Sequence, residues 1–273
     1  MSLARLDNEI FFKKAFTDPF VFRAFVKDII GIEVNPEKIE TEKGFEPSVG
    51  NVDFRYDIFA EDVAKRVIVE IQKVEYDHNF DSFLHYHLQA ITEQQTGSGK
   101  GYAVGKTVYT IVVITAPYKA DPRTGEVYQD DVLISSINPK NLKGMERRIF
   151  NHELIFLNPN YRGSDTPPNY LDWLQLISES ISHPENPKIN FLNAGVQRVA
   201  SLLDHNNISP QEWELSKIEY GKKVVLEIKW EEGIEEGEAR KAREVARNLK
   251  SMGMDADTIS KATGLSDEEI SNL

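Results

Sequence analysis

The feature that most constrains the fold is the segment from Val108 to Thr115, which reads VYTIVVIT. Its side chains are β-branched or aromatic and almost wholly apolar, with no alternation between apolar and charged residues. A short segment of this kind predicts a strand that is buried on both faces. Such a strand needs strands beside it and helices above and below it, and the flanking sequence supplies candidates for both.

Periodicity predicts the elements before this strand. They are a helix over residues 7–30 with a break at Pro19, strands over 39–45, 52–60 and 67–72, and a helix over about 79–95. The glycine-rich stretch Thr96 to Gly101 is a loop by composition, and it lacks the Gly-Lys-Ser/Thr ending of a phosphate-binding loop. The first 115 residues therefore predict an α/β or α+β core with a mixed sheet.

The rest of the chain becomes progressively helical. Strands are expected over 132–137 and 153–157, mainly helix over 168–230, a charged helix over 231–250, and short helices over 255–263 and 266–273. We expect a core at residues 1–165, a helical extension at 166–250 and a two-helix unit at 251–273. This unit has helix-turn-helix proportions. Its last helix begins with three acidic residues, which repel phosphate, so a packing or self-association role is favoured.

Composition excludes several classes of protein. The 273 residues are 40% hydrophobic, which is enough for one full core and small appendages. No cysteine is present, so disulfides and thiolate metal sites are excluded. No apolar run approaches the roughly 20 residues of a membrane span, and the N-terminus lacks a secretory apolar core. We therefore expect a cytoplasmic protein without a membrane partner or an organic cofactor.

The net charge of −12 argues against a surface coated with phosphate-binding cations. It does not exclude a nuclease, because a cleft that gathers Mg²⁺ must itself be acidic. It favours help from a partner or from a second subunit, as in a homodimer, if the protein holds DNA tightly.

A pair of carboxylates is the main candidate site. If residues 52–60 and 67–72 form a hairpin that turns between Val63 and Ala64, Asp57 lies opposite Glu70, with Cβ atoms about 5 Å apart. Gln72 shares the face of Glu70. Two acids in an apolar sheet repel each other, so one is protonated unless a cation such as Mg²⁺ joins them. The backbone carbonyl of Ile71 offers a further ligand.

Spacing alone leaves alternatives open. Asp57 and Glu70 could lie at solvent-exposed strand edges or pair with Arg55 or Arg66. The register is assumed, and a slip of one residue breaks the argument. Asp53 is a rival for the role of Asp57, because it alternates onto the same face.

These segments resemble a known family. YDIFAED from Tyr56, followed by VIVEIQ from Val67, is similar to the recombination-promoting nucleases and transposases of the Rpn family. That family belongs to the PD-(D/E)XK superfamily and typically has Glu-x-Gln where the superfamily more often has Glu-x-Lys. The stretch from Glu9 to Phe16 resembles its opening Asp-x-x-Phe-Lys-x-x-Phe. Tyr86 and Gln94 fall where the family has a tyrosine and a glutamine.

The tail, with Glu-Glu-Gly-Ile-Glu-Glu-Gly at residues 231–237, is also typical of the family. The chain departs from the pattern in two places. The first-helix acid is Glu9 rather than Asp, and Ser82 to Tyr86 lacks the arginine that often precedes the Leu-Tyr-Tyr segment. These departures leave the core motif intact.

The resemblance implies a restriction-endonuclease-like mixed β-sheet core flanked by helices, with a C-terminal helical extension. It implies Asp57 and Glu70 as metal ligands, Gln72 at the third motif position and Glu9 as an acid that helps to hold metal. The implied activity is Mg²⁺-dependent hydrolysis of DNA phosphodiester bonds, with Mn²⁺ as a substitute, in recombination or transposition. Two alternatives stay open: a non-cleaving DNA-binding or assembly protein of a mobile element, and an RNA nuclease.

Overall fold

A computed structural model of the chain describes residues 1–45, 55–72, 80–95, 104–121 and 124–273. Its strands are β1 (Ile39–Gly44), β2 (Arg55–Glu61), β3 (Lys65–Gln72), β4 (Thr107–Ile114), β5 (Val132–Ser136) and β6 (Glu153–Leu157). Its α-helices are α1 (Glu9–Phe16), α2 (Pro19–Ile30), α3 (Phe80–Thr92), α4 (Pro168–Ser182), α5 (Ala194–Leu203), α6 (Pro210–Ser251), α7 (Ala256–Thr263) and α8 (Asp267–Ser271). Two 3₁₀ turns, η1 (Glu93–Gln95) and η2 (His205–Asn207), follow α3 and α5.

The six strands form one sheet in the order β1-β2-β3-β4-β6-β5. β4 pairs in parallel with β3 and with β6, and the other three pairs are antiparallel. The apolar strand expected over 108–115 is therefore β4, in the interior of the sheet. Val112 and Val113 point to opposite faces, and both are fully buried.

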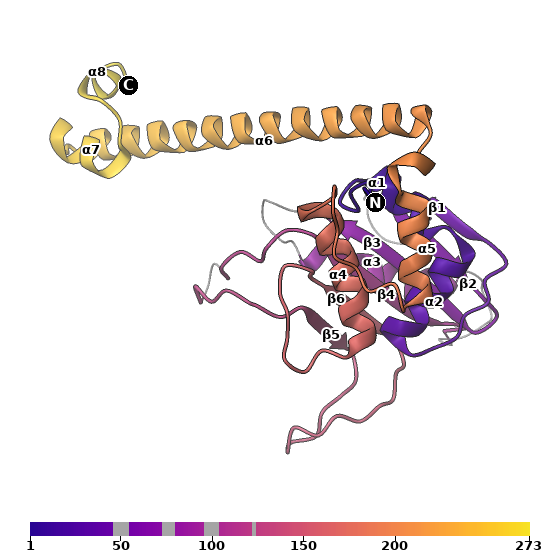
Figure 1. The fold of residues 1–273 in the computed structure, drawn as a ribbon. Coiled ribbons are helices and arrows are strands. Elements are labelled where there is room, and N and C mark those ends of the chain that lie inside the picture. The colour runs from indigo at the N-terminus through magenta and orange to yellow at the C-terminus, as the bar shows by residue number, and fades with distance from the viewer. Residues whose placement is uncertain (46–54, 73–79, 96–103, 122–123) are drawn as a thin grey trace. The chain divides into compact units, whose positions relative to one another are not determined.

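Helices cover the two faces of the sheet (Figure 1). On one face, α1, α2, α4 and α5 share a core cluster with Ile58, Val69 and Ile111 from the strands. On the other face, α3 packs against two smaller clusters, one around Ile68 and one around Phe156. Side chains of β3 that alternate between the two faces of the sheet are therefore buried under helices on each side.

Local signals fix the helix boundaries near the N-terminus. Asp18 caps the second helix, because its carboxylate accepts the N–H groups of Phe20 and Val21. Pro19 occupies the first turn of α2, where its missing N–H costs nothing. Gly31 ends α2 in the left-handed conformation, with a φ of 76°. The expected break at Pro19 is confirmed.

The chain divides into two compact units, Met1–Ser216 and Lys217–Leu273. Helices α4 and α5 lie in the first unit, since Trp173 and Val199 belong to the same core cluster as the sheet. The second unit has its own small core, in which Ala246, Ile259 and Ile270 are buried. A capping box begins α8: Ser266 and Glu269 bond each other's backbone N–H.

The expected fold class is confirmed as a mixed α/β sheet flanked by helices, followed by a C-terminal helical region. No helix in the described part of the chain combines the length and the apolar character needed to cross a membrane.

Candidate active site

The hairpin of β2 and β3 has the register on which the candidate carboxylate pair depends. Ile58 pairs with Val69, and Glu61 pairs with Arg66 at the turn. In this register Asp57 and Glu70 occupy the next opposed positions, beyond the last backbone pair. Asp53 and the glycine-rich stretch 96–101 lie outside the described residues.

Side-chain hydrogen bonds join the two strands where the backbone ladder stops. The N–H of Asp57 donates to Oε1 of Glu70 at 3.2 Å, and the N–H of Ile71 donates to Oδ2 of Asp57 at 2.9 Å. Each carboxylate therefore accepts a strand N–H in place of a carbonyl oxygen. Glu70 is 2% exposed, and the side chain of Asp57 is 17% exposed. The two acids lie together, largely shielded from water.

Burial controls the protonation of this pair. It raises the pKa of Asp57 to about 6, against the opposing effects of the Ile71 N–H and of Lys13. Burial also raises the pKa of Glu70 well above its ordinary range, and repulsion from Asp57 adds to this. Burial and mutual repulsion therefore disfavour ionisation of both acids at once, as expected for two acids in an apolar sheet.

Two more acids approach Asp57 from other elements. Glu9 lies in the first turn of α1, and Glu42 lies on β1. Oxygen atoms of Glu9, Glu42 and Asp57 lie within 4.8 Å of one another. These three are the group of acids that could share a metal ion within the described ranges, and Glu70 adjoins the group through Asp57.

A lysine is inserted among these acids. Lys13, one turn after Glu9 on α1, forms ion pairs with Glu9 and with Glu42, and its Nζ lies 3.9 Å from Oδ1 of Asp57. Burial lowers the pKa of Lys13, but the hydrogen bonds to Glu42 and Glu9 outweigh it and raise the pKa above its usual value. The ammonium group therefore stays charged and partly offsets the carboxylates.

Sequence reasoning did not single out Glu42. It is one of two acids on a short strand. Only the pairing of β1 with β2 brings it beside Asp57, between the pairs Thr41–Ile58 and Lys43–Tyr56. Among the non-glycine residues that the structure describes, Glu42 alone has a positive φ, which is 53°. No local pattern distinguishes it from Glu40.

The other two predicted site residues lie at the end of β3. Gln72 is half-buried, and its backbone carbonyl accepts the N–H of Thr115 at 2.9 Å. Ile71 contributes its N–H to Asp57. The roles predicted for the Gln72 amide and the Ile71 carbonyl stay predictions.

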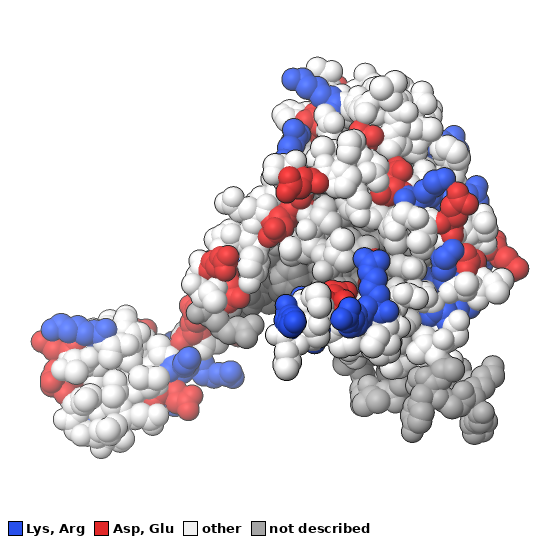
Figure 2. Space-filling view, turned by 90° about the horizontal axis from the view of Figure 1, so that it is seen from below, with Lys and Arg blue, Asp and Glu red and all other residues white. Residues whose placement is uncertain are grey.

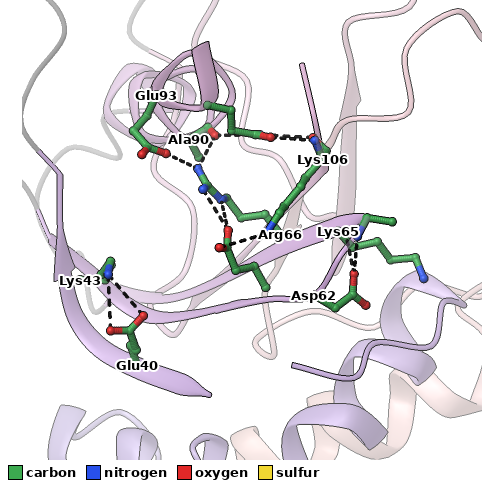
Figure 3. A network of polar contacts seen from close by, with 11 residues as sticks. Glu40, Lys43, Asp62, Lys65, Arg66, Ala90, Glu93 and Lys106 are labelled. Carbon is green, nitrogen blue, oxygen red and sulfur yellow. Dashed lines mark hydrogen bonds and ion pairs between the residues drawn. The ribbon is translucent and has the colours of Figure 1, made fainter. Parts of the chain in front are cut away.

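A buried arginine fixes α3 to the hairpin that carries Glu70 (Figure 3). Arg66 is 6% exposed. It donates to Glu61 at 3.0 Å, to Glu93 at 2.5 Å and to the carbonyl of Ala90 at 2.9 Å. Lys106 adds an ion pair to Glu61 at 3.0 Å. The sequence left open that Arg66 pairs with Asp57 or Glu70. The structure instead pairs Arg66 with Glu61 and Glu93.

Tyr86 on α3 and Gln94 in η1, which fall at positions where the family has a tyrosine and a glutamine, also have structural contacts. Gln94 clamps the start of β4: its Oε1 accepts the N–H of Lys106 at 2.7 Å, and its amide donates to the carbonyl of the same residue at 3.2 Å. The carbonyl of Tyr86 accepts the hydroxyl of Tyr56 at 3.0 Å. Burial raises the pKa of Tyr86, and the charges of Glu70 and Asp57 raise it further, so Tyr86 borders the acidic site.

The protein thus has an α/β fold with an acidic cluster that contains Lys13. The cluster lies at the open end of the β2–β3 hairpin, away from the turn. Residues 239–273 match the family model described as the Rpn/YhgA-like nuclease family, C-terminal HTH domain. This match shows that the C-terminal segment of the chain is similar to the C-terminal domain of that family, in agreement with the resemblance seen in the sequence. No curated protein and no solved structure matches the chain.

The matched segment covers the end of α6 together with α7 and α8. The family model describes it as a helix-turn-helix domain, whereas the sequence analysis favoured a packing or self-association element. The description of that model names a nuclease family.

Proposed function

We propose that this chain is a Mg²⁺-dependent DNA endonuclease that hydrolyses phosphodiester bonds during recombination or transposition. The observation that supports this most directly is the contact between Asp57 and Glu70 at the end of the hairpin, with Glu9 and Glu42 beside Asp57. Four acids from four separate elements, α1, β1, β2 and β3, converge there, although carboxylates repel one another.

The donor atoms of this cluster suit Mg²⁺ or Mn²⁺. Carboxylate oxygens are the hard ligands that Mg²⁺ prefers, and Mg²⁺ needs only one or two of them because it keeps several waters. The charge balance also fits, since four carboxyl groups adjoin one ammonium group, that of Lys13. A divalent cation relieves the remaining repulsion and allows Asp57 and Glu70 to release their proton.

Each residue has a proposed role. Asp57, Glu70 and the carbonyl of Ile71 hold the metal ion, which polarises the scissile phosphate and lowers the pKa of a bound water when present. Gln72 orients the attacking water or a phosphate oxygen, because its amide has no charge and is no general base. Lys13 supplies the positive charge that Gln72 lacks, from α1 instead of β3. Glu9 and Glu42 position the Lys13 ammonium.

Cleavage assays on the full chain test this proposal. Wild type with Mg²⁺ or Mn²⁺ is incubated with plasmid and with single-stranded DNA, beside Glu70→Ala and Glu42→Gln. The matched control is Glu40→Gln, which removes the same charge from the same strand but at an acid that pairs with Lys38 and Lys43. We expect cleavage by wild type and by the control, and a loss of at least tenfold in Glu70→Ala. Absence of metal-dependent cleavage by wild type refutes the proposal.

A second candidate is a catalytically inactive DNA-binding or assembly protein of a mobile element. It is favoured by the glutamine at position 72 and by a family match that covers only the helix-turn-helix segment. Calorimetric titration with Mg²⁺ and Mn²⁺ separates the candidates, because binding that depends on Glu70 supports the nuclease. RNA substrates in the same cleavage assay test the remaining alternative, an RNA nuclease.

A further inference from the structure

Residues 137–150, which connect β5 to β6, form a projecting hairpin that we call the basic arm. It extends beyond the sheet in Figure 1, below the label of β5. Lys140 and Glu146 form an antiparallel bridge, and Gly144 closes the turn with a φ of 79°. At its base, Oδ1 of Asn138 accepts the N–H groups of Ile149 and Phe150, each at 2.7 Å. The arm is thus a hairpin loop that one backbone bridge and the side chain of Asn138 hold together.

The charge of the arm is opposite to that of the chain. It contains one acidic residue, Glu146, which bonds to Ser136. Its cations are all exposed, and they are Lys140, Lys143, Arg147 and Arg148. None of the four forms an ion pair with another described residue. A segment with a net charge of +3, four cations and one acid, therefore stands on a chain of −12. Figure 2, seen from below, shows Lys and Arg side chains gathered toward the middle of that face.

Apolar side chains of the arm are exposed as well. Leu142 at the turn is 108% exposed, Met145 49%, Ile149 63% and Phe150 46%. The arm therefore has no apolar core of its own, and side-chain hydrogen bonds hold its shape. A group of exposed apolar residues on an ordered projection indicates a surface that a partner covers.

The combination of charge and shape selects DNA as that partner. A narrow projecting loop can approach a duplex, and its four exposed cations can meet the phosphates. An exposed apolar turn is the kind of group that packs against sugars or base steps within a groove. A chain with a net charge of −12 must concentrate its phosphate contacts in a few places, and the basic arm is such a place. We infer that the basic arm binds the sugar-phosphate backbone of DNA.

This inference rests on the proposed DNA substrate, but not on the metal site. The arm joins β6 at Glu153, which pairs with Tyr109, whereas Glu70 pairs with Val112 near the other end of β4. The arm thus leaves the sheet at the end of the strands opposite the candidate active site. It therefore contributes to binding of the duplex and not to the chemistry at the scissile phosphate.

The test measures DNA affinity of the full chain in EDTA, where metal-dependent cleavage is absent. Fluorescence anisotropy follows a labelled duplex from about 50 to 200 mM salt. The arm variant changes its four cations to glutamine. The matched control changes four exposed cations outside the arm, Arg23, Lys27, Lys38 and Lys188, to glutamine. A conservative variant exchanges lysine and arginine within the arm and keeps its charge.

Each phosphate contact contributes about 0.9 to the slope of log affinity against log salt, so loss of all four lowers the slope by about 3–4. We expect the arm variant to bind at least tenfold more weakly at low salt, with unchanged thermal unfolding because the arm has no core. The control and the conservative variant should bind like wild type.

Three results overturn the inference. The first is an unchanged salt slope in the arm variant, and the second is failure of wild type to bind DNA. The third is a change in the sedimentation of the protein on substitution of the arm cations, with no change in DNA affinity. That result would identify the arm as a self-association surface. Failure of the proposed function looks different: wild type then binds DNA through the arm but does not cut it with Mg²⁺.

Discussion

Replacing Asp57 by asparagine should stabilise the metal-free protein while it removes metal binding. Burial raises the pKa of Asp57 from 3.8 to about 6 in the folded state. One pKa unit corresponds to about 1.4 kcal/mol, so ionised Asp57 costs the fold about 3 kcal/mol at about pH 8. Asparagine carries no charge, and its Oδ1 can still accept the N–H of Ile71. The free energy of unfolding should therefore rise by up to about 3 kcal/mol.

The pH dependence provides the sharpest check. Because the folded pKa exceeds the unfolded one, the folded state binds more protons between the two values, and wild type gains stability as pH falls through about 6. The advantage of Asp57→Asn should therefore be largest at about pH 8 and vanish near pH 4. Thermal unfolding in EDTA should show a rise of roughly 6–12 °C at the higher pH.

Asp62→Asn is the matched control on the same hairpin. Burial raises the pKa of Asp62, but hydrogen bonds from the N–H groups of Ala64 and Lys65 outweigh it and lower the pKa. The same substitution there should destabilise the protein at neutral pH. Added Mg²⁺ should raise the melting temperature of wild type but not of Asp57→Asn, since only a folded state that binds the ion gains from it. A lower melting temperature of Asp57→Asn at about pH 8, or a gain that persists at low pH, refutes the reasoning.

Two further predictions concern the scaffold. Arg66→Met should destabilise the first unit by about 3 kcal/mol in urea unfolding, because it removes the partner of Glu93, whose charge is partly buried; an unchanged midpoint contradicts this. Gly195→Ala should cost about 1–3 kcal/mol, since a Cβ there would lie 2.8 Å from the side chains of Ala24 and Trp173. Differential scanning calorimetry measures this loss, and a gain in stability from the better helix former would show that the contact relaxes freely.

Much of the site followed from the hairpin. Apolar alternation and the short polar turn predicted that Asp57 lies opposite Glu70, and the pairs from Ile58–Val69 to Glu61–Arg66 have that register. The prediction succeeded because a hairpin is local: turn length and the buried face together determine the register. The caps at Asp18 and Ser266 were equally local, since each depends on residues within one turn of helix.

The cation and the fourth acid of the cluster were decided by tertiary structure. Lys13 reaches Asp57 because α1 packs across the face that carries Ile58, and Glu42 reaches it because β1 pairs with β2. Neither position carries a local signal, since an exposed lysine on a helix and an acid on a short strand are common.

The strands and the opposed carboxylate pair thus follow from local sequence patterns. Only the tertiary structure decided which charges surround that pair, because contacts between distant segments depend on how the whole sheet and its helices pack. The same holds for the basic arm. Its charges are visible in the sequence, but its projection from the end of the sheet follows from the place of β5 and β6 at the edge.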